Sequence, residues 1–332
     1  MLRVLHLGLG EIGKGTIDVL LAQSKAFRLA AVADVNPALA GKPLRDVLRR
    51  RDVPNLRIAP NLKDALKSAG KIDIATMTTG SRTVDVRDTL EALIRARIHV
   101  ASTCEELAFP GLRAARMAGE LDKKARRAGV AILGTGVNPG FAMDAFALAC
   151  TAPCKMVRGI RVLRSLDAGK RRQQLQKKVG AGMALGEVQK LIRKGAIGHV
   201  GLGESVAMIA AGLGWKLAAI KEKFTPVVAE AAVASAFYSV QPGQVRGMRM
   251  TAAGIVAGKT KIELDLTMAL GAETYDEVQI DGDPALTIRT TTGFPGDSST
   301  VGILVNAART LPTLEPGVRT MMDVLRIRSL GV

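Results

Sequence analysis

A glycine-rich turn near the start of the chain has the residue types and spacing that hold a phosphate-bearing ligand. Its residues are Gly8, Leu9, Gly10, Glu11, Ile12 and Gly13. It follows the apolar run Leu2–Leu7 and leads into a predicted helix over residues 16–23. In such a G-x-G-x-x-G turn the first glycine permits the tight bend, the second lets a pyrophosphate approach the backbone, and the third lets helix and strand pack closely. The helix N-terminus then stabilises the phosphate charge, so the pattern predicts a dinucleotide site.

An acidic residue stands where such a site holds a ribose. Asp34 lies 21 residues after Gly13, at the end of the second predicted strand. A carboxylate there bonds the ribose 2′-hydroxyl of NAD and repels the 2′-phosphate of NADP. Asn36, Lys42 and Arg45 are close enough in the sequence to tolerate that phosphate. Asn36 is therefore a candidate for coenzyme binding, and both NAD and NADP stay open.

Further polar residues follow the third and fourth predicted strands, over residues 72–77 and 98–102. Thr78 and Thr79 come after the third strand, and Ser102 ends the fourth. The carboxyl ends of parallel strands are where an open α/β sheet binds ligands. We therefore expect these three side chains at the coenzyme site, with a plain strand-to-helix cap as the alternative for the threonines.

Two adjacent carboxylates come directly after the fourth strand. Glu105 and Glu106 follow Cys104, and a carboxylate in a cleft is a candidate for general acid–base catalysis. Neighbouring residues face different directions, so one of the two is expected to point into the cleft. The competing interpretation is a helix start, where acids stabilise the helix dipole. The sequence supplies no base for Cys104, which we interpret as a small buried hydrophobe.

A turn rich in Gly, Asn and Pro follows the fifth predicted strand, where a domain junction and a cleft are expected. Asn138 in this turn offers both a donor and an acceptor, or is simply a turn former before proline. His199 lies in a glycine-rich segment and is poorly explained by core packing. The other two histidines are assigned no role. With three scattered histidines and no paired cysteines, we expect no metal site.

The elements that must position these residues change in kind along the chain. Predicted helices over 61–68, 84–96 and 112–127 alternate with the strands, including one over 29–35 and a fifth over 130–133, which indicates βαβ units. Beyond residue 144, strands over 160–165, 245–256, 261–270 and 285–289 are joined with helices over 186–193, 204–211 and 298–308. The sequence thus predicts an α/β chain, with an N-terminal Rossmann doubly wound parallel sheet and a C-terminal α+β domain whose sheet is largely antiparallel.

The length of 332 residues suits two domains, and 48% apolar residues suffice for a sizeable core. We expect a dinucleotide-binding Rossmann domain over residues 1–137 and a substrate and oligomerisation domain over 138–297. A C-terminal helix and tail over 298–332 is expected to pack back on the Rossmann domain. An antiparallel sheet with a flat apolar face commonly pairs subunits, so we expect a homodimer.

The chain has 47 basic and 30 acidic residues, a formal net charge of +17 that suggests a nucleic-acid partner. Residues 155–199 carry more than half of the excess. However, no helix-turn-helix, zinc-finger or basic-zipper pattern occurs, and aromatic residues are only 3%. We expect no nucleic-acid partner, no membrane segment and, with three cysteines that cannot form a disulfide framework, a cytoplasmic location.

Several motif blocks carry a resemblance to a known family. The generic block is the turn at residues 8–13, and the specific ones are Ser102-Thr103-Cys104-Glu105-Glu106-Leu107 and Gly136-Val137-Asn138-Pro139-Gly140-Phe141-Ala142-Met143-Asp144. Further blocks follow in order at 175–182, 198–205, 213–215 and 316–323. In these blocks the chain resembles the 2,4-diaminopentanoate dehydrogenases and related native amine dehydrogenases, a branch of the dihydrodipicolinate reductase-like superfamily.

The resemblance implies an NAD(P)-dependent amine dehydrogenase, which deaminates an amine oxidatively and, in reverse, aminates a ketone or aldehyde with ammonia. It implies a glutamate of the Cys-Glu-Glu block as the acid/base, and of the two we prefer Glu106 to Glu105. The residues expected to line the substrate site are Asn138, Pro139, Phe141, Arg164, His199 and Trp215. Arg164 is alternatively a surface cation and Trp215 a core residue. The identity of the amine stays open.

The main alternative is another imine- or C=C-reducing NAD(P)H oxidoreductase of the same superfamily. The dihydrodipicolinate reductases proper carry a His-His pair followed by Lys and Ser-Gly-Thr, which this sequence lacks. A degenerate, non-catalytic member is a further possibility, against which the intact glycine turn and acids argue. The basic stretch at 155–199 would repel a doubly cationic diamine, so the diamine is the less secure part of the implied substrate.

Overall fold

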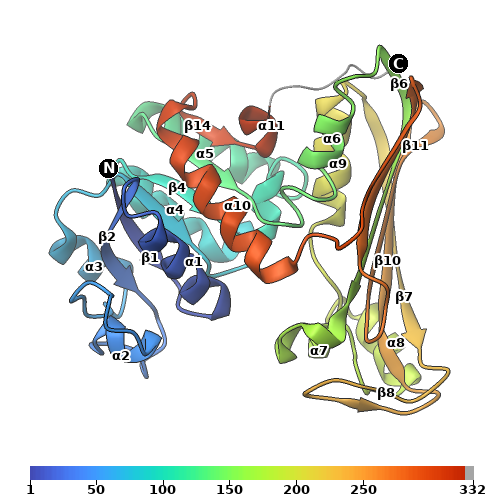
Figure 1. Cartoon of the computed structure of the whole chain (residues 1–332). Coiled ribbons are helices and arrows are strands. Elements are labelled where there is room, and N and C mark those ends of the chain that lie inside the picture. The colour runs from blue at the N-terminus through green and yellow to red at the C-terminus, as the bar shows by residue number, and fades with distance from the viewer. Residues whose placement is uncertain (326–332) are drawn as a thin grey trace. The chain divides into compact units, whose positions relative to one another are not determined.

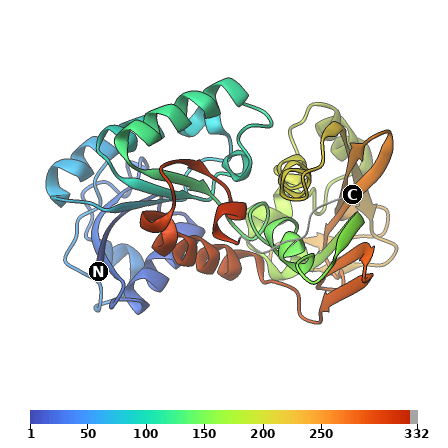
Figure 2. The ribbon, with the colours of Figure 1, turned by 90° about the horizontal axis from the view of Figure 1, so that it is seen from above.

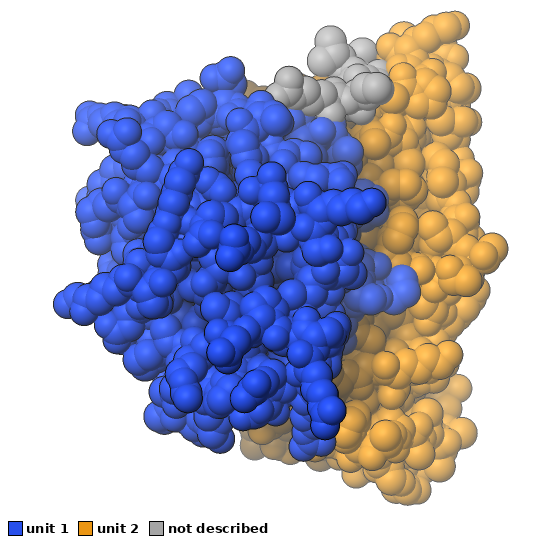
Figure 3. All heavy atoms as spheres, turned by 60° about the vertical axis from the view of Figure 1, so that its left-hand side comes forward, with its two compact units in different colours: residues 1–141, 295–326 blue, residues 142–294, 327–332 orange. Residues whose placement is uncertain are grey.

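The computed structural model describes residues 1–325, which divide into two units by their internal contacts (Figure 3). Unit 1 comprises Met1–Phe141 and the described chain from Pro295 on, and unit 2 comprises Ala142–Phe294. The chain therefore leaves unit 1 once and returns to it. The last part of the expected tail, residues 326–332, lies outside the described residues.

A six-stranded sheet forms the centre of unit 1. Its strands are β1 (Leu2–Leu7), β2 (Phe27–Ala33), β3 (Ile74–Met77), β4 (His99–Ser102), β5 (Ala131–Gly134) and β14 (Gly317–Arg319). Their order is β14-β5-β4-β3-β1-β2, and every neighbouring pair is parallel. The predicted parallel sheet is confirmed. Because all strands run the same way, the turns after β1, β3, β4 and β5 lie along one edge of the sheet.

Helices cover both faces of this sheet (Figures 1 and 2). They are α1 (Glu11–Ala22), α2 (Leu44–Leu48), α3 (Leu62–Ala69), α4 (Thr83–Arg95), α5 (Ala115–Ala128), α10 (Gly296–Thr310) and α11 (Met321–Val324). Leu5 and Leu7 of β1 belong to one buried cluster with α3, α4 and α5. Val4 belongs to a second cluster with α1 and α10, which lie side by side. Since side chains alternate along a strand, His6 is on the same face of β1 as Val4.

The first helix begins earlier than the sequence suggested. We expected a glycine-rich turn up to residue 15 and helix from residue 16; glycine has low helix propensity. The structure starts α1 at Glu11, directly after Gly10. Gly13 therefore lies inside the first turn of the helix, where its missing side chain permits close packing on β1, as described below.

Unit 2 is built on a second six-stranded sheet. Its strands are β6 (Met156–Asp167), β7 (Leu217–Val228), β10 (Val245–Val256), β11 (Lys259–Ala269), β12 (Tyr275–Asp283) and β13 (Leu286–Thr290), in the order β13-β12-β6-β11-β10-β7. Only β6 and β11 pair in parallel; the other pairs are antiparallel. The predicted largely antiparallel sheet is confirmed, but the sequence did not predict β7 or β12. A small hairpin pairs β8 (Val233–Ala234) with β9 (Ser239–Val240).

One face of this sheet is covered by helix. The helices of unit 2 are α6 (Ala145–Cys150), α7 (Gln173–Lys178), α8 (Leu185–Arg193) and α9 (Leu202–Gly212). Helix α9 packs against β7, β10 and β11, and a Cβ on Gly254 of β10 would lie only 2.7 Å from Val206 of α9. We call the opposite side of the sheet the outer face; it carries Arg161, Arg249, Glu263 and Asp265. No helix of the described chain is both long and apolar enough to cross a membrane.

Candidate functional site

The glycine-rich turn has the shape that a close backbone approach requires. Gly8 has a φ of +94°, and a Cβ on it would lie 2.7 Å from the carbonyl oxygen of Thr78. A Cβ on Gly13 would overlap the carbonyl oxygen of Gly8. The position of a Cβ on Gly10 is open, with no atom within 4 Å. The turn is thus tight against the protein at Gly8 and Gly13 and accessible at Gly10.

The residues between these glycines offer backbone rather than side chains. Leu9 is buried in the core and Ile12 is half-buried. Glu11 is exposed, and its carboxylate lies 3.2 Å from the ammonium of Lys14. Because the first N–H groups of a helix have no intrahelical acceptor, the start of α1 after Gly10 is suited to bind phosphate oxygens.

Two side chains hold the carbonyl of Gly8 from the strand side. His6 Nε2 lies 2.7 Å from this oxygen, and the hydroxyl of Thr78 donates to it at 3.0 Å. His6 Nδ1 lies 2.8 Å from the hydroxyl of Thr76. Since a carbonyl only accepts, Nε2 carries the proton and Nδ1 accepts from Thr76. Burial lowers the pKa of His6 to about 4, so the ring is neutral at pH 7.

The predicted ribose ligand, Asp34, is tied to the same turn. Its Oδ2 accepts from the backbone N–H of Leu9 at 2.5 Å, and its Oδ1 accepts from the N–H of Asn36 at 2.8 Å. Asn36 is exposed, and its own Oδ1 accepts from the N–H of Ala38 at 3.0 Å. The carboxylate therefore links the glycine turn to the loop after β2.

The other predicted coenzyme residues lie at the ends of neighbouring strands. Met77 of β3 is paired with Ser102 of β4, so Thr78, Thr79 and Ser102 share the edge of the sheet. Thr79 is exposed. Ser102 is fully buried, and its hydroxyl accepts from the N–H of Cys104 at 3.1 Å. Its role in the structure is thus to shape the turn that leads to the two glutamates.

The two glutamates differ in how they are held. Both lie in the short 3₁₀ helix η1 (Glu105–Ala108) and are half-buried. Glu106 Oε2 accepts from the backbone N–H of Thr83 at 2.8 Å, and the N–H of Glu106 donates to the carbonyl of Ser81 at 3.2 Å. Within residues 1–325, no hydrogen bond or ion pair involves the side chain of Glu105. The structure therefore orients Glu106 against the start of α4 and leaves Glu105 unanchored.

The neighbouring thiol is buried and held in its protonated form. Cys104 is buried, and burial raises its pKa to about 12. The adjacent carboxylates act in the same direction. Cys104 packs in the core cluster of unit 1, in accordance with its interpretation as a small hydrophobe. Within the described chain, no group of three or more His, Cys, Asp and Glu side chains could hold a metal ion.

The Asn-Pro turn follows β5 at this same edge. Asn138 and Pro139 are buried and Phe141 is half-buried. The N–H of Val137 donates to the hydroxyl of Thr300 at 3.2 Å, so the first turn of α10 holds this segment. The turn therefore depends on a residue that comes more than a hundred positions later in the chain.

Arg164, a predicted substrate residue of unit 2, is fully engaged by protein groups. It is 3% exposed and forms a buried ion pair with Asp276 through Nη1, while Nη2 donates to the carbonyl of Phe294 at 2.8 Å. The other oxygen of Asp276 accepts from the N–H of Phe294 at 2.7 Å. This explains Arg164 as an internal clamp. The alternative of a surface cation is wrong, because the side chain is buried.

His199 contacts the row of the sheet that contains Arg164. The N–H of His199 contacts the sulfur of Met250 at 3.3 Å. Met250 of β10 is paired with Leu266 of β11, which is paired with Arg164 of β6. His199 is half-buried, at the start of the segment that enters α9.

Trp215 lies far from this row. It follows the C-terminus of α9, whereas His199 precedes its N-terminus, and eleven helical residues span about 16 Å. Trp215 is 8% exposed, and the ammonium of Lys261 lies 5.1 Å from its ring centroid. The structure therefore does not bring Trp215 and His199 together.

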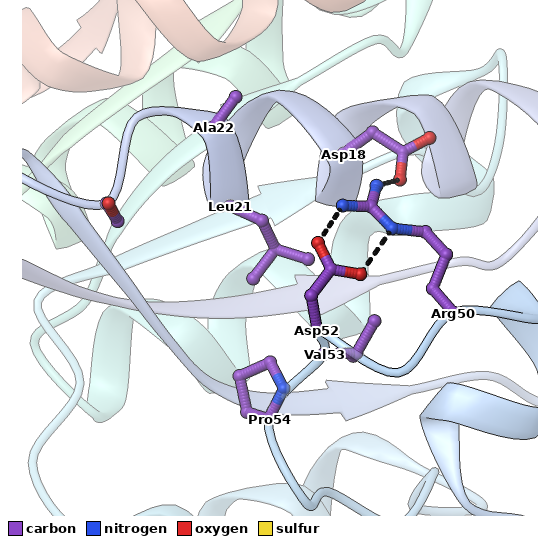
Figure 4. Close-up of a pocket in the computed structure, with 8 residues that line it drawn as sticks. Asp18, Leu21, Ala22, Arg50, Asp52, Val53 and Pro54 are labelled. Carbon is purple, nitrogen blue, oxygen red and sulfur yellow. Dashed lines mark hydrogen bonds and ion pairs between the residues drawn. The ribbon is translucent and has the colours of Figure 1, made fainter.

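A separate hollow of about 660 Å³ lies on unit 1 beside the C-terminal half of α1 (Figure 4). Arg50 donates to Asp18 at 2.5 Å and to Asp52 through two nitrogens, one at 2.9 Å. These bonds raise the pKa of Arg50. Because the three charges satisfy one another, this arrangement joins the loop after α2 to α1 and is not a second phosphate site.

Four residues that support the site were not found from the sequence. They are His6, Thr83, Thr300 and Asp276. Of these four, His6 alone is marked in the sequence, as a polar residue within the apolar run of β1. The others act through partners distant in sequence, so no local pattern marks them.

The chain is similar in sequence to a known family of dehydrogenases. A family profile described as the 2,4-diaminopentanoate dehydrogenase C-terminal domain matches residues 141–330. A 2,4-diaminopentanoate dehydrogenase from Acetoanaerobium sticklandii is 30% identical over 329 residues, which are 97% of this chain and 93% of that protein.

Solved structures show the same fold. The amine dehydrogenase from Mycobacterium smegmatis has a TM-score of 0.83 at 20% identity, over 97% of this chain and 95% of that chain. GenD2 from gentamicin A biosynthesis, solved in complex with NAD, has a TM-score of 0.57 at 16% identity, over 98% of this chain and 90% of that chain.

Proposed function

The chain belongs to the 2,4-diaminopentanoate dehydrogenase family and is an oxidoreductase that acts on amines, and from this premise we propose that it catalyses the reversible, nicotinamide-dependent deamination of an amine. In the reverse direction it aminates a ketone or aldehyde with ammonia. The observation that carries the proposal is the anchored carboxylate of Glu106, at the sheet edge that also carries the glycine turn.

The residues of unit 1 fit a dinucleotide. The turn is accessible at Gly10 and has no room for side chains at Gly8 and Gly13. We propose that this backbone and the start of α1 hold the pyrophosphate, with Asp34 and Asn36 at the ribose and Thr78, Thr79 and Ser102 bordering the coenzyme. The relative GenD2 was solved with NAD, which supports a nicotinamide coenzyme. Because a carboxylate repels a 2′-phosphate, Asp34 favours NAD over NADP.

Glu106 is suited to move the proton of the substrate amine. Its Oε2 is fixed by the N–H of Thr83, which orients the carboxylate towards a substrate. The carboxylate binds the ammonium form and takes a proton from it, so that the lone pair on nitrogen can expel a hydride from the adjacent carbon. The nicotinamide, when bound, accepts that hydride.

The same carboxylate serves the hydrolytic half of the reaction. Loss of hydride leaves an iminium. Glu106 first passes the proton that it took from the ammonium to solvent, and it then takes a second proton from water as the water oxygen attacks the iminium carbon. The resulting carbinolamine loses ammonia to give the carbonyl product. Glu105 is the alternative acid/base, because it lies in the same short helix and is likewise half-buried.

The proposed substrate residues come from the turn after β5 and from the segments on either side of α9. Asn138, Pro139 and Phe141 follow β5 at the ligand edge, and His199 enters α9. Arg164 was expected in this set, and its ion pair with Asp276 gives it an internal role instead. Trp215, at the other end of α9 from His199, is proposed only for an outer part of a large substrate.

The domain roles and setting are also proposals. We assign coenzyme binding to residues 1–137, substrate binding and dimerisation to 138–297, and support of the first domain to the tail from 298. The chain is proposed to form homodimers through the outer face of the sheet of unit 2, which carries exposed ion pairs in place of the flat apolar face on which the expectation of a homodimer was based. Its three free cysteines suit a reducing cytoplasm.

The proposal is tested by coenzyme oxidation against a panel of ketones and aldehydes, with and without ammonia, using NADH and NADPH separately. We expect the absorbance of the reduced coenzyme to fall only when ammonia is present. The fall is expected to be faster with NADH than with NADPH. Equal rates without ammonia would instead identify an imine- or C=C-reducing enzyme. No oxidation with any carbonyl compound would contradict the amine-dehydrogenase activity.

A further inference from the structure

The buried histidine of β1 has no part in the proposed reaction, and its contacts converge on the glycine turn. We infer that His6 is a positioning residue for the coenzyme: its hydrogen bond fixes the Gly8–Leu9 peptide and thereby pre-shapes the turn for the pyrophosphate. The inference rests on the proposed function, since it concerns the affinity of the same dinucleotide site.

The Gly8–Leu9 peptide is held at both of its polar groups. Its carbonyl accepts from His6 Nε2 at 2.7 Å and from the Thr78 hydroxyl at 3.0 Å. Its N–H donates to Asp34 at 2.5 Å. Gly8 has a φ of +94° and, as a glycine, restricts rotation of this peptide little. The side-chain hydrogen bonds, rather than the local backbone, therefore fix the orientation of the peptide.

This orientation is transmitted to the helix that faces the phosphates. The Cα of Gly13 packs so closely on the Gly8 carbonyl that an added Cβ would overlap it, and the same Cβ would lie 2.9 Å from His6 Nε2. If the carbonyl moves, the first turn of α1 must move with it. The N–H groups of that turn are the ones that would hold the pyrophosphate, and fixing them in advance removes an ordering cost from binding.

The chemistry of His6 is specific to this task. An apolar side chain would fill the space between β1 and α1 but would leave the Gly8 carbonyl with one donor fewer. The hydroxyl of Thr76, which faces His6 across the β1–β3 pair, donates to Nδ1 and so keeps the proton on Nε2. Both residues are fully buried, so neither can contact the coenzyme itself.

The test compares three variants of His6 and Thr76 with a control variant at another histidine. His6→Phe keeps a ring and removes the donor, whereas His6→Gln can still donate to the Gly8 carbonyl and accept from Thr76. Thr76→Val removes the hydroxyl that fixes the tautomer. The control is His99→Phe: His99 lies at the amino end of β4, where its Nδ1 accepts from the N–H of Ala131 at 3.0 Å, away from the turn.

Binding of NADH and NADPH is measured by fluorescence titration of folded protein, together with KM, kcat and the thermal midpoint. We expect His6→Phe to weaken coenzyme binding about tenfold, with KM for the coenzyme rising in step and kcat at saturation within about twofold. His6→Gln restores most of the affinity, and Thr76→Val weakens it severalfold. His99→Phe lowers the thermal midpoint and leaves coenzyme affinity unchanged.

The outcomes separate the two proposals. A wild-type chain that binds neither NADH nor NADPH contradicts the proposed function. A wild-type chain that binds coenzyme, with His6→Phe and Thr76→Val binding equally well, overturns the inference alone. If His6→Phe does not fold, the other two variants decide. The inference is overturned if Thr76→Val binds coenzyme as tightly as the wild type, or if His6→Gln loses more than tenfold in affinity.

Discussion

At the scale of single residues, the two adjacent glutamates differ in how their side chains are anchored. They share a short helix and a half-buried setting, but only Glu106 is anchored, through the N–H of Thr83. An acid/base must keep its orientation through two proton transfers, which an anchored carboxylate does better.

We therefore predict that Glu106→Gln lowers kcat for ammonia-dependent coenzyme oxidation by about 10²–10⁴-fold, because the amide keeps the contact with Thr83 but cannot take a proton. Coenzyme affinity is expected to stay unchanged. Glu105→Gln is the matched control and is expected to retain its rate within a few fold. The reverse ranking would transfer the acid/base role to Glu105, and full activity in both variants would remove it from this block.

The sequence predicted that one of these glutamates faces the cleft but did not determine which one. That choice depends on Thr83 and Ser81, which lie more than twenty positions away and meet Glu106 only in the folded sheet. The same holds for Arg164, whose basic neighbours in sequence suggested a surface cation. Its partner Asp276 comes from β12, a strand that the sequence did not predict.

At the scale of elements, the clamp between Arg164 and Asp276 joins β6, β12 and the segment at Phe294. We predict that Arg164→Met lowers the free energy of unfolding by about 3–5 kcal/mol, because it leaves a carboxylate buried without its partner. The control is Lys155→Met, directly before the same strand, where an exposed lysine lies 3.7 Å from Asp283 and contributes below about 1 kcal/mol.

Urea unfolding of both variants measures the difference. Equal stability of Arg164→Met and the wild type, combined with a raised KM for the carbonyl substrate, would show that Arg164 contacts substrate after all. A large loss of stability with an unchanged KM supports the internal role.

The elements that the sequence predicted best are those with clear periodicity. β1 and β10 have the expected bounds, since their buried residues form apolar runs or alternate with polar ones. β7 and β12 were missed because they carry charged residues within the strand: Lys221 and Lys223 of β7 and Glu277 of β12 are on the outer face, and Glu222 of β7 is on the opposite face. Such strands are specified by pairing with their neighbours rather than by their own propensity.

At the scale of the whole molecule, the outer face of the sheet of unit 2 is the surface proposed to pair two copies of the chain. Arg161 and Arg249 on it lie next to Glu263 and Asp265, so opposite charges alternate across neighbouring strands. In an isologous interface a residue away from the twofold axis contacts a different residue of the second copy, so this alternation allows opposite charges to pair between the copies.

Light scattering after size separation is predicted to give twice the mass of the chain. Arg249→Glu is expected to shift the protein towards monomer, because it places a third acid beside Asp265 and Glu263. Arg116→Glu, an exposed site on α5 of unit 1, is the control and should leave the mass unchanged. A monomeric wild type would contradict the proposed assembly.

The return of the chain to unit 1 has a consequence for synthesis. β5 is an inner strand only because β14, which begins at Gly317, pairs with it. When the first 141 residues have left the ribosome, that strand is still an open edge, and α1 still lacks its neighbour α10. The described part of unit 2 is a single stretch of the chain, and its last strand, β13, ends at Thr290, before β14 begins. Unit 1 is therefore synthesised first but completed last. Its open sheet edge must stay protected from aggregation while the rest of the chain is translated.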